Sequence, residues 1–165
     1  MDSWEQTLAD LASGRGAALK RHAFLLCGNA AQADDLIQEA LVRAFTRPRR
    51  VPRPGASEAY VRAIMVNLFI DGARRHSRWS RVAPLLRPAA MTPDPADQVS
   101  DRDAMLTALR SLSPRQRACV VLRYYEDLPV ADVAAVLGVG EGTVKRYLSE
   151  ARSHVAMRLS SAERG

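Results

Sequence analysis

The sequence predicts an all-α protein made of two small helical domains joined by a proline-rich linker. Aromatic residues make up only 5% of the chain and β-branched runs are short, so the usual material of half-buried strands is lacking. In several long segments apolar residues recur every three or four positions, which is the spacing that buries one face of a helix. Prolines crowd residues 81–100 and place the linker there, between domains at 1–80 and 101–165.

One helix of the first domain is expected to begin at Asn29, which with Gln32 has the pattern of a capping box. Its apolar stripe is Leu36, Ile37, Ala40, Leu41, Ala44 and Phe45. Off this stripe lie Asp34, Asp35, Gln38 and Glu39. Because carboxylates repel phosphate, this acidic face is expected to contact protein. Glu39 and Arg43 are also spaced as an ordinary exposed ion pair, which would contribute little.

A second long helix, which Ser57 can cap, is expected to reach Trp79. Its apolar positions are Val61, Ile64, Met65, Leu68 and Phe69. Its other side carries Asn67, Asp71, Arg74, Arg75 and Arg78. Guanidiniums can neutralise phosphates and stack on bases, and an amide can read a base edge, so this stripe suits a single nucleic-acid strand. Alternatively, the arginines only favour the negative end of the helix dipole.

In the second domain, two more helix starts have capping signatures. Ser100 pairs with Asp103, and Ser113 pairs with Gln116, where Pro114 occupies the first helical position. We therefore expect one helix to begin after Ser100 and another after Ser113.

The end of the chain is expected to form a helix-turn-helix. Pro129 opens a short helix that Gly138 can end, and a tight turn of Val139, Gly140, Glu141 and Gly142 precedes a long final helix. Val144, Leu148, Ala151, Val155 and Leu159 form its buried stripe. Its first turns project Thr143, Lys145, Arg146, Tyr147 and Ser149. These side chains can reach bases and phosphates in a major groove, although a polar face in solvent has the same pattern.

Charge and composition narrow the class of protein. A formal net charge of +6 and a pI of about 10.0 favour a polyanionic partner, although a basic surface without one is the alternative. Cys27 and Cys119 are expected to be reduced thiols. No paired metal-ligand spacing and no nucleophile with a base is found, so no metal, no cofactor and no enzymatic activity are expected. The absence of a leader or a long apolar run predicts a cytoplasmic protein without membrane insertion.

The order of motifs resembles the extracytoplasmic function (ECF) sigma factors of bacterial RNA polymerase, most closely the SigE-like actinobacterial subgroup. Residues 34–40 (DDLIQEA) are similar to region 2.2, and residues 59–75, with AYVR, NLFID and RR, to regions 2.3 and 2.4. Residues 112–117 (LSPRQR), 124–128 (YYEDL) and 142–145 (GTVK) are similar to region 4. The resemblance implies that core RNA polymerase and promoter DNA are the partners, with an anti-sigma factor as a further possible partner.

The resemblance also assigns roles to the residues already singled out. It implies that the acidic face binds the β′ clamp helices, that region 4 meets the β flap and reads the −35 element, and that the Asn67 stripe melts and reads the −10 element. Gly140, Tyr147 and Glu150 depart from the family's pattern around the recognition helix, so the promoter sequence is not implied. A free-standing LuxR-like regulator is the alternative, because residues 143–148 (TVKRYL) resemble that recognition helix as well. The acidic helix argues against it.

Overall fold

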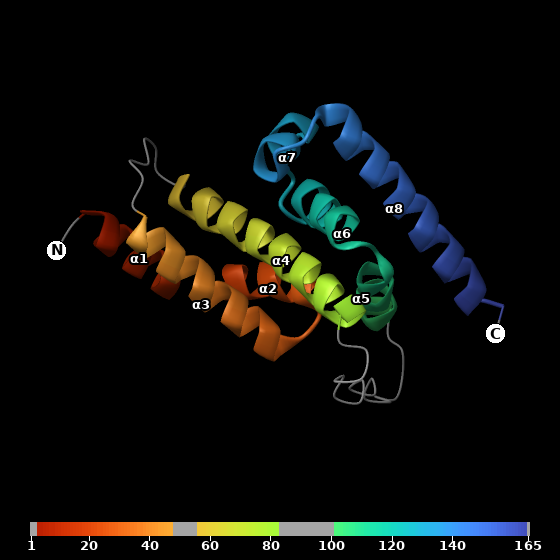
Figure 1. The fold of residues 1–165 in the computed structure, drawn as a ribbon, viewed down its shortest axis with the longest axis horizontal. Helices are drawn as coiled ribbons and strands as arrows, with labels where there is room; N and C mark the ends of the chain where they lie inside the picture. The colour runs from red at the N-terminus through yellow and green to blue at the C-terminus, as the bar shows by residue number, and fades with distance from the viewer. Residues whose placement is uncertain (1–2, 48–55, 83–100, 165) are drawn as a thin grey trace.

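The computed structural model describes residues 3–47, 56–82 and 101–164, and all regular structure in these segments is helical (Figure 1). The elements are α1 (Ser3–Gly14), α2 (Gly16–Cys27), α3 (Ala30–Thr46), α4 (Ala56–Val82), α5 (Asp101–Ser111), α6 (Pro114–Val120), the π-helix η1 (Val121–Tyr125), α7 (Val130–Leu137) and α8 (Glu141–Ala162). The prediction of an all-α protein is confirmed. Most of the expected linker and the Ser100 cap lie outside the described residues.

Two of the predicted helix starts have the expected caps. The Asn29 side chain accepts a hydrogen bond from the Gln32 backbone N–H at 3.1 Å and so caps α3, with one of the two bonds of the predicted capping box. At α6 both bonds of the capping box form, with Ser113 and Gln116 each bonding the other's backbone N–H through their side chains at 3.2 Å. Ser57 is not the cap of the second long helix, because α4 already begins at Ala56 and Ser57 lies in its first turn.

The first four helices form a bundle in which α2, α3 and α4 lie side by side. Their apolar stripes meet in a core where Leu19, Leu26, Val61 and Met65 are almost completely buried. Trp4 fastens α1 to this bundle, because its indole Nε1 donates to the Ala44 carbonyl at 2.8 Å. One side of α3 and one side of α4 lie outside this core and carry exposed polar residues.

The last helices form a second unit in which α6 and α7 pack against α8. Val144, Leu148 and Ala151 of the predicted stripe of α8 are buried, and Val155 is half-buried. Leu159, which is predicted to belong to the same stripe, is 40% exposed near the end of the helix. Between α6 and α7 the chain widens into the π-helix η1 and then turns at Asp127, the only described non-glycine residue with a positive φ, of 55°. The Leu128 N–H donates to the Leu122 carbonyl at 3.1 Å across this turn, so the helix end is closed.

The two units are docked against each other. In Figure 1, α6 lies beside α4, and α8 runs along the far side of α6. Buried residues of the first unit, such as Met65 and Leu68, belong to the same hydrophobic core as Cys119, Leu122 and Val133 of the second. Among the described helices, none is both long enough and apolar enough to cross a bilayer.

Candidate functional site

The acidic face of α3 is displayed as the sequence predicts. Asp34, Asp35, Gln38 and Glu39 are all exposed. Leu36 and Ala40, on the other side of the helix, are buried in the bundle, so burial fixes which way the polar side chains point. Glu39 pairs with Arg43 at 3.2 Å and both side chains are about half exposed, which makes this the weak surface ion pair that the spacing suggests.

The polar stripe of α4 is also displayed. Asn67, Asp71, Arg74, Arg75 and Arg78 are exposed and follow one another at helical spacing along one side of α4. Asn67 differs from the other four in having a partner in the second unit. Its side-chain nitrogen donates to the Val136 carbonyl of α7 at 3.3 Å and to the Ala63 carbonyl of its own helix at 3.0 Å.

A cavity of about 350 Å³ opens beside Asn67 between α3, α4 and α7. Its lining residues are Arg43, Arg47, Tyr60, Ala63, Ile64, Asn67, Leu68, Ala135 and Val136. The Tyr60 hydroxyl donates to the Arg47 carbonyl at 3.2 Å, so the aromatic ring is held at the cavity wall. From the sequence, Tyr60 is named only as part of the AYVR motif, and Arg47 is not named at all. Tyr60 lies two helical turns before Asn67, so the helical repeat alone could have placed the two on one face.

The predicted helix-turn-helix is present. Gly138 adopts the left-handed conformation with φ 66° and ends α7, and Gly140 is the extended residue from which α8 begins. The Val139 N–H bonds the Ala134 carbonyl at 3.1 Å and the Thr143 N–H bonds the Gly140 carbonyl at 3.1 Å. These bonds fix the angle between α7 and α8, and with it the direction in which the first turns of α8 point.

The predicted reading residues of α8 are not equally available. Lys145, Arg146 and Ser149 are exposed, whereas Thr143 and Tyr147 are half-buried. Tyr147 therefore does not project fully away from the buried stripe, because it flanks Val144 and Leu148 and packs against the core. The Arg146 guanidinium lies over the Tyr147 ring at 5.4 Å and its Nε is 3.7 Å from the Glu150 carboxylate.

A buried charged cluster joins the two units, and the sequence reasoning missed it. The Glu126 carboxylate, which follows η1, accepts from His22 Nδ1 of α2 at 2.8 Å and pairs with Arg62 of α4. His22 is fully buried and the Glu126 side chain is 4% exposed. Arg62 also pairs with Glu58, which in turn binds Arg15 at 3.1 Å. The buried stripe of α2 includes position 22, so the periodicity could have signalled a buried histidine.

The electrostatics of this cluster favour an ionised Glu126. Burial alone would raise the pKa of the Glu126 carboxyl. The hydrogen bond and the electrostatic attraction from His22, followed by the guanidinium charges of Arg62 and Arg15, outweigh the burial and hold that pKa below its ordinary value. The carboxylate is therefore a stable acceptor for both partners from the first unit.

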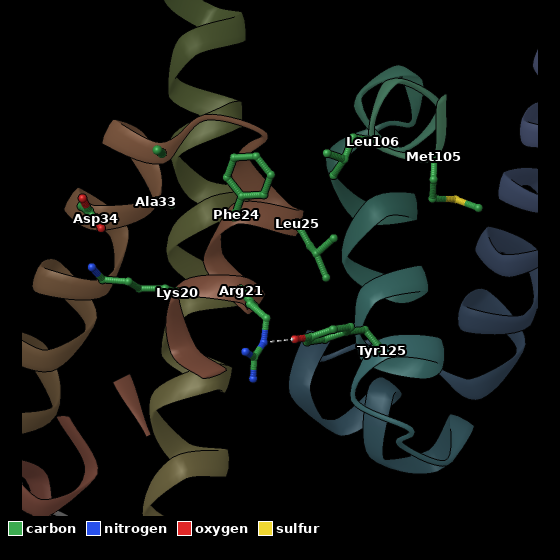
Figure 2. Close-up of a pocket in the computed structure, with 10 residues that line it drawn as sticks. Lys20, Arg21, Phe24, Leu25, Ala33, Asp34, Met105, Leu106 and Tyr125 are labelled. Carbon is green, nitrogen blue, oxygen red and sulfur yellow. Dashed lines mark hydrogen bonds between the residues drawn. The ribbon is translucent and has the colours of Figure 1, made fainter. Parts of the chain in front are cut away.

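Further polar contacts cross the same junction. Arg117 of α6 donates to the Leu26 carbonyl of α2 at 2.7 Å, and Arg110 of α5 donates to the Gly28 carbonyl. Figure 2 shows the Arg21 side chain of α2 reaching the Tyr125 hydroxyl, 3.2 Å away, across a groove between the two units. The groove has a volume of about 590 Å³. Its walls are mostly apolar and include Lys20, Arg21, Phe24, Leu25, Ala30, Ala33, Asp34, Met105, Leu106 and Tyr125.

The two cysteines are free thiols, as the sequence predicts. Burial raises the pKa of both Cys27 and Cys119 to about 11, against a weaker opposing effect of nearby arginines. Both thiols are therefore protonated near neutral pH and belong to the packing of the protein.

Comparison with known proteins identifies the two units. The Sigma-70 region 2 family matches residues 14–79, and the Sigma-70, region 4 family matches residues 102–155. The chain is 34% identical to the RNA polymerase sigma-E factor of Streptomyces avermitilis over 90% of this chain and 83% of that protein. It is 36% identical to the ECF RNA polymerase sigma factor SigL of Mycobacterium tuberculosis over 90% of this chain and 85% of that protein.

The fold is shared with a solved sigma factor. The structure of RpoE from Bartonella quintana, determined in complex with the anti-sigma factor NepR, matches 97% of this chain and 98% of that chain with a TM-score of 0.69 and 24% identity. The LuxR-like alternative is not favoured, because the first unit belongs to sigma region 2 and the helix-turn-helix to sigma region 4. The chain belongs to the ECF RNA polymerase sigma factors.

Proposed function

We propose that three exposed faces of this sigma factor have three separate binding roles. Residues 1–80 bind core polymerase through the acidic face of α3 and capture a parted −10 strand on the polar stripe of α4. Residues 101–165 read the −35 element with the first turns of α8, and residues 81–100 connect the two. The observation that carries the proposal is that these faces, named from the sequence, all lie on the outside of helices whose opposite sides are buried.

The acidic face is suited to a protein partner. Asp34, Asp35 and Glu39 bring carboxylates together on the outer side of α3, where they would repel the phosphates that the rest of this basic protein attracts. The β′ clamp helices of core polymerase are the partner that we propose, with the β flap as the partner of region 4. This assignment places the protein in the cytoplasm.

The stripe on α4 is suited to an unpaired strand. The exposed arginines can neutralise phosphates, and Tyr60 and Asn67, which lie two helical turns apart on one side of α4, offer a ring for stacking and an amide for a base edge. Capture of an unstacked base offsets the few kcal/mol that unstacking costs and so stabilises melted DNA. No hydrolysable cofactor enters this scheme.

Core-polymerase binding is tested by gel filtration with Asp35→Lys. Reversal of one charge on the acidic face should weaken co-elution with core enzyme by about tenfold, a change of about 1.4 kcal/mol. Asp10→Lys makes the same change at an exposed position of α1 and should bind as the wild-type chain does. If both variants bind core enzyme like the wild type, the acidic face is not the contact.

Strand capture is tested on a DNA duplex that carries a preformed bubble. Arg75→Ala and Asn67→Ala should each lower the affinity of the core–sigma complex for bubble DNA, by about 1–3 kcal/mol for a lost stacking or base contact. The same variants should retain affinity for fully paired DNA that carries only a −35 element. Equal losses on both DNAs would contradict the division between α4 and α8.

We also propose an anti-sigma factor as a partner. The groove between α2, α3 and α5 has an apolar lining with Lys20 and Asp34 at its edge, which suits an amphipathic helix. If an anti-sigma factor of the host binds there, Phe24→Glu should abolish that binding and leave core-polymerase binding in place. A variant that still binds the anti-sigma factor with wild-type affinity would remove the groove from the proposal.

A further inference from the structure

We propose that Glu126 is a latch between the region 2 unit (α1–α4) and the region 4 unit (α5–α8), and that it holds the chain in a self-docked state that cannot read a promoter. The inference rests on the proposed division of promoter reading between α4 and α8. It assigns a role to a cluster that neither reading face uses. The latch consists of Glu126 with its two partners, His22 and Arg62.

The latch uses both oxygens of one buried carboxylate. Oε1 accepts from His22 Nδ1 at 2.8 Å, and Oε2 pairs with an Arg62 guanidinium nitrogen. A carboxylate only accepts, so Nδ1 carries the proton of the first bond. His22 is fully buried, and among the described residues Glu126 is the only hydrogen-bond partner of its ring, because Nε2 has none. Separation of the two units would break the contacts of Glu126 with His22 and Arg62. The loss is costly unless water or another protein replaces these contacts.

The local backbone aims Glu126 at the region 2 unit. The helix after α6 widens into η1, where the Glu126 N–H bonds the Val121 carbonyl five residues earlier at 3.0 Å. Asp127 then takes the left-handed conformation and ends the helix. Asp and Asn tolerate this conformation better than most residues, so the sequence supports a turn that leaves Glu126 at the inner side of the helix end.

The docked state covers part of the proposed −10 site. The Asn67 side chain donates to the Val136 carbonyl of α7 at 3.3 Å. Ala135 and Val136 of the same helix form one wall of the cavity beside Asn67. An incoming base would have to displace α7 from this position.

Distance excludes simultaneous reading of both promoter elements in the docked state. The −35 and −10 elements are separated by about 25 base pairs, or about 85 Å of B-form DNA at 3.4 Å per base pair. Asn67 touches Val136, and Lys145 follows Val136 by only nine residues, which can span at most about 32 Å even when extended. The docked chain therefore cannot place α4 and α8 on their two elements, and the latch has to open when the sigma factor engages polymerase and promoter.

The latch is tested by a double-mutant cycle between Glu126→Gln and Arg62→Gln in the full chain. Each variant should lower the melting temperature, but the double variant should lower it by about 2–4 °C less than the two single shifts would together, because the shared contact can be lost only once. The additional pairing of Arg62 with Glu58 is lost in both backgrounds and cancels in the cycle. Asp127→Asn is the matched control, since it removes the same charge from a side chain that is 95% exposed.

Small-angle X-ray scattering gives the second readout. Glu126→Gln and Arg62→Gln should each increase the radius of gyration with unchanged helical circular dichroism, whereas Asp127→Asn should scatter as the wild type does. If Glu126→Gln loses helical signal, Arg62→Gln alone decides, because its site is in the other unit. Additive melting shifts together with wild-type radii of gyration would overturn the latch.

Core-polymerase titration separates failure of the latch from failure of the proposed function. If docking competes with polymerase binding, Glu126→Gln should bind core enzyme more tightly than wild type, by up to about tenfold. Wild-type affinity in both Glu126→Gln and Asp127→Asn would contradict competition between latch and polymerase. No binding by any of the chains would refute the proposed function, while the melting cycle and the scattering would still decide whether the latch exists.

Discussion

Replacement of Arg117 should lower the stability of the protein strongly, because its side chain bonds both the region 2 unit and the region 4 unit. Its Nη1 donates to the Leu26 carbonyl at the end of α2, and its Nη2 donates to the Arg110 carbonyl, both at 2.7 Å. The guanidinium lies 5.6 Å from the centre of the Phe69 ring. Arg117→Met keeps an unbranched apolar stem in the same space and removes all of these polar contacts.

The expected loss is set by two charged hydrogen bonds, reduced by the cost of burying the charge. A hydrogen bond from a charged donor contributes about 1.5–3 kcal/mol, and a cation–π contact about 0.5–1 kcal/mol. Burial lowers the pKa of the Arg117 guanidinium, and the neighbouring charge of Arg110 lowers it further, which shows that its desolvation is unfavourable. We therefore expect a net loss of about 3 kcal/mol, equivalent to a decrease in melting temperature of about 6–12 °C.

Thermal unfolding followed by circular dichroism measures this loss. Arg115→Met is the control, because Arg115 lies two residues away on α6 and makes no hydrogen bond or ion pair with the part of the chain that the structure describes. That variant should melt within about 2 °C of wild type, as expected for a position without a special contact. Equal melting temperatures for the two variants would refute the reasoning that Arg117 fastens α6 to α2.

Three further predictions concern other parts of the molecule. Gly28→Ala should lower the melting temperature by at least about 2–4 °C, because Gly28 has φ 69° and an added Cβ would lie 2.6 Å from Nε of Arg110. The stability difference between wild type and Glu126→Gln should be present at neutral pH and decrease as the pH falls below about 4.3, since the pKa of this carboxyl is depressed in the folded state; a difference that stays constant from neutral pH to well below this value would contradict this origin. Lys145→Ala should reduce the slope of log affinity against log salt for −35 duplex binding by about 1, whereas Arg158→Ala, farther along the exposed end of α8, should leave it unchanged.

Much of the fold could be predicted from local patterns. The stripe from Leu36 to Phe45 and the capping box at Ser113 specify helices through neighbours three and four residues apart, and the structure has both helices. Phe45, at the end of the predicted stripe, is nevertheless 49% exposed. Gly138 ends α7 because a left-handed residue is needed there, a requirement that is visible in a single sequence. The exposed faces of α3 and α4 followed from the same periodicity, because a buried stripe determines which side chains remain outside.

The junction between the units could not be predicted in this way. Glu126 and His22 are 104 residues apart, and no local spacing relates them. Position 126 also follows a π-helical turn, which shifts the helical register and breaks the repeat of 3.6 residues on which the sequence patterns depend. Tyr147 is half-buried for a related reason, because it lies at the edge of the α8 stripe, where the repeat alone does not decide between core and solvent.

The most direct test of the account is permanganate footprinting on a promoter that transcript sequencing after overexpression identifies. Core RNA polymerase with this chain should make thymines near the −10 element reactive, and Arg75→Ala should reduce that reactivity while −35 protection remains. Core enzyme alone should leave the same thymines unreactive. If the chain binds that DNA without polymerase and adds no reactive thymines when polymerase is present, its proposed role in promoter opening is contradicted.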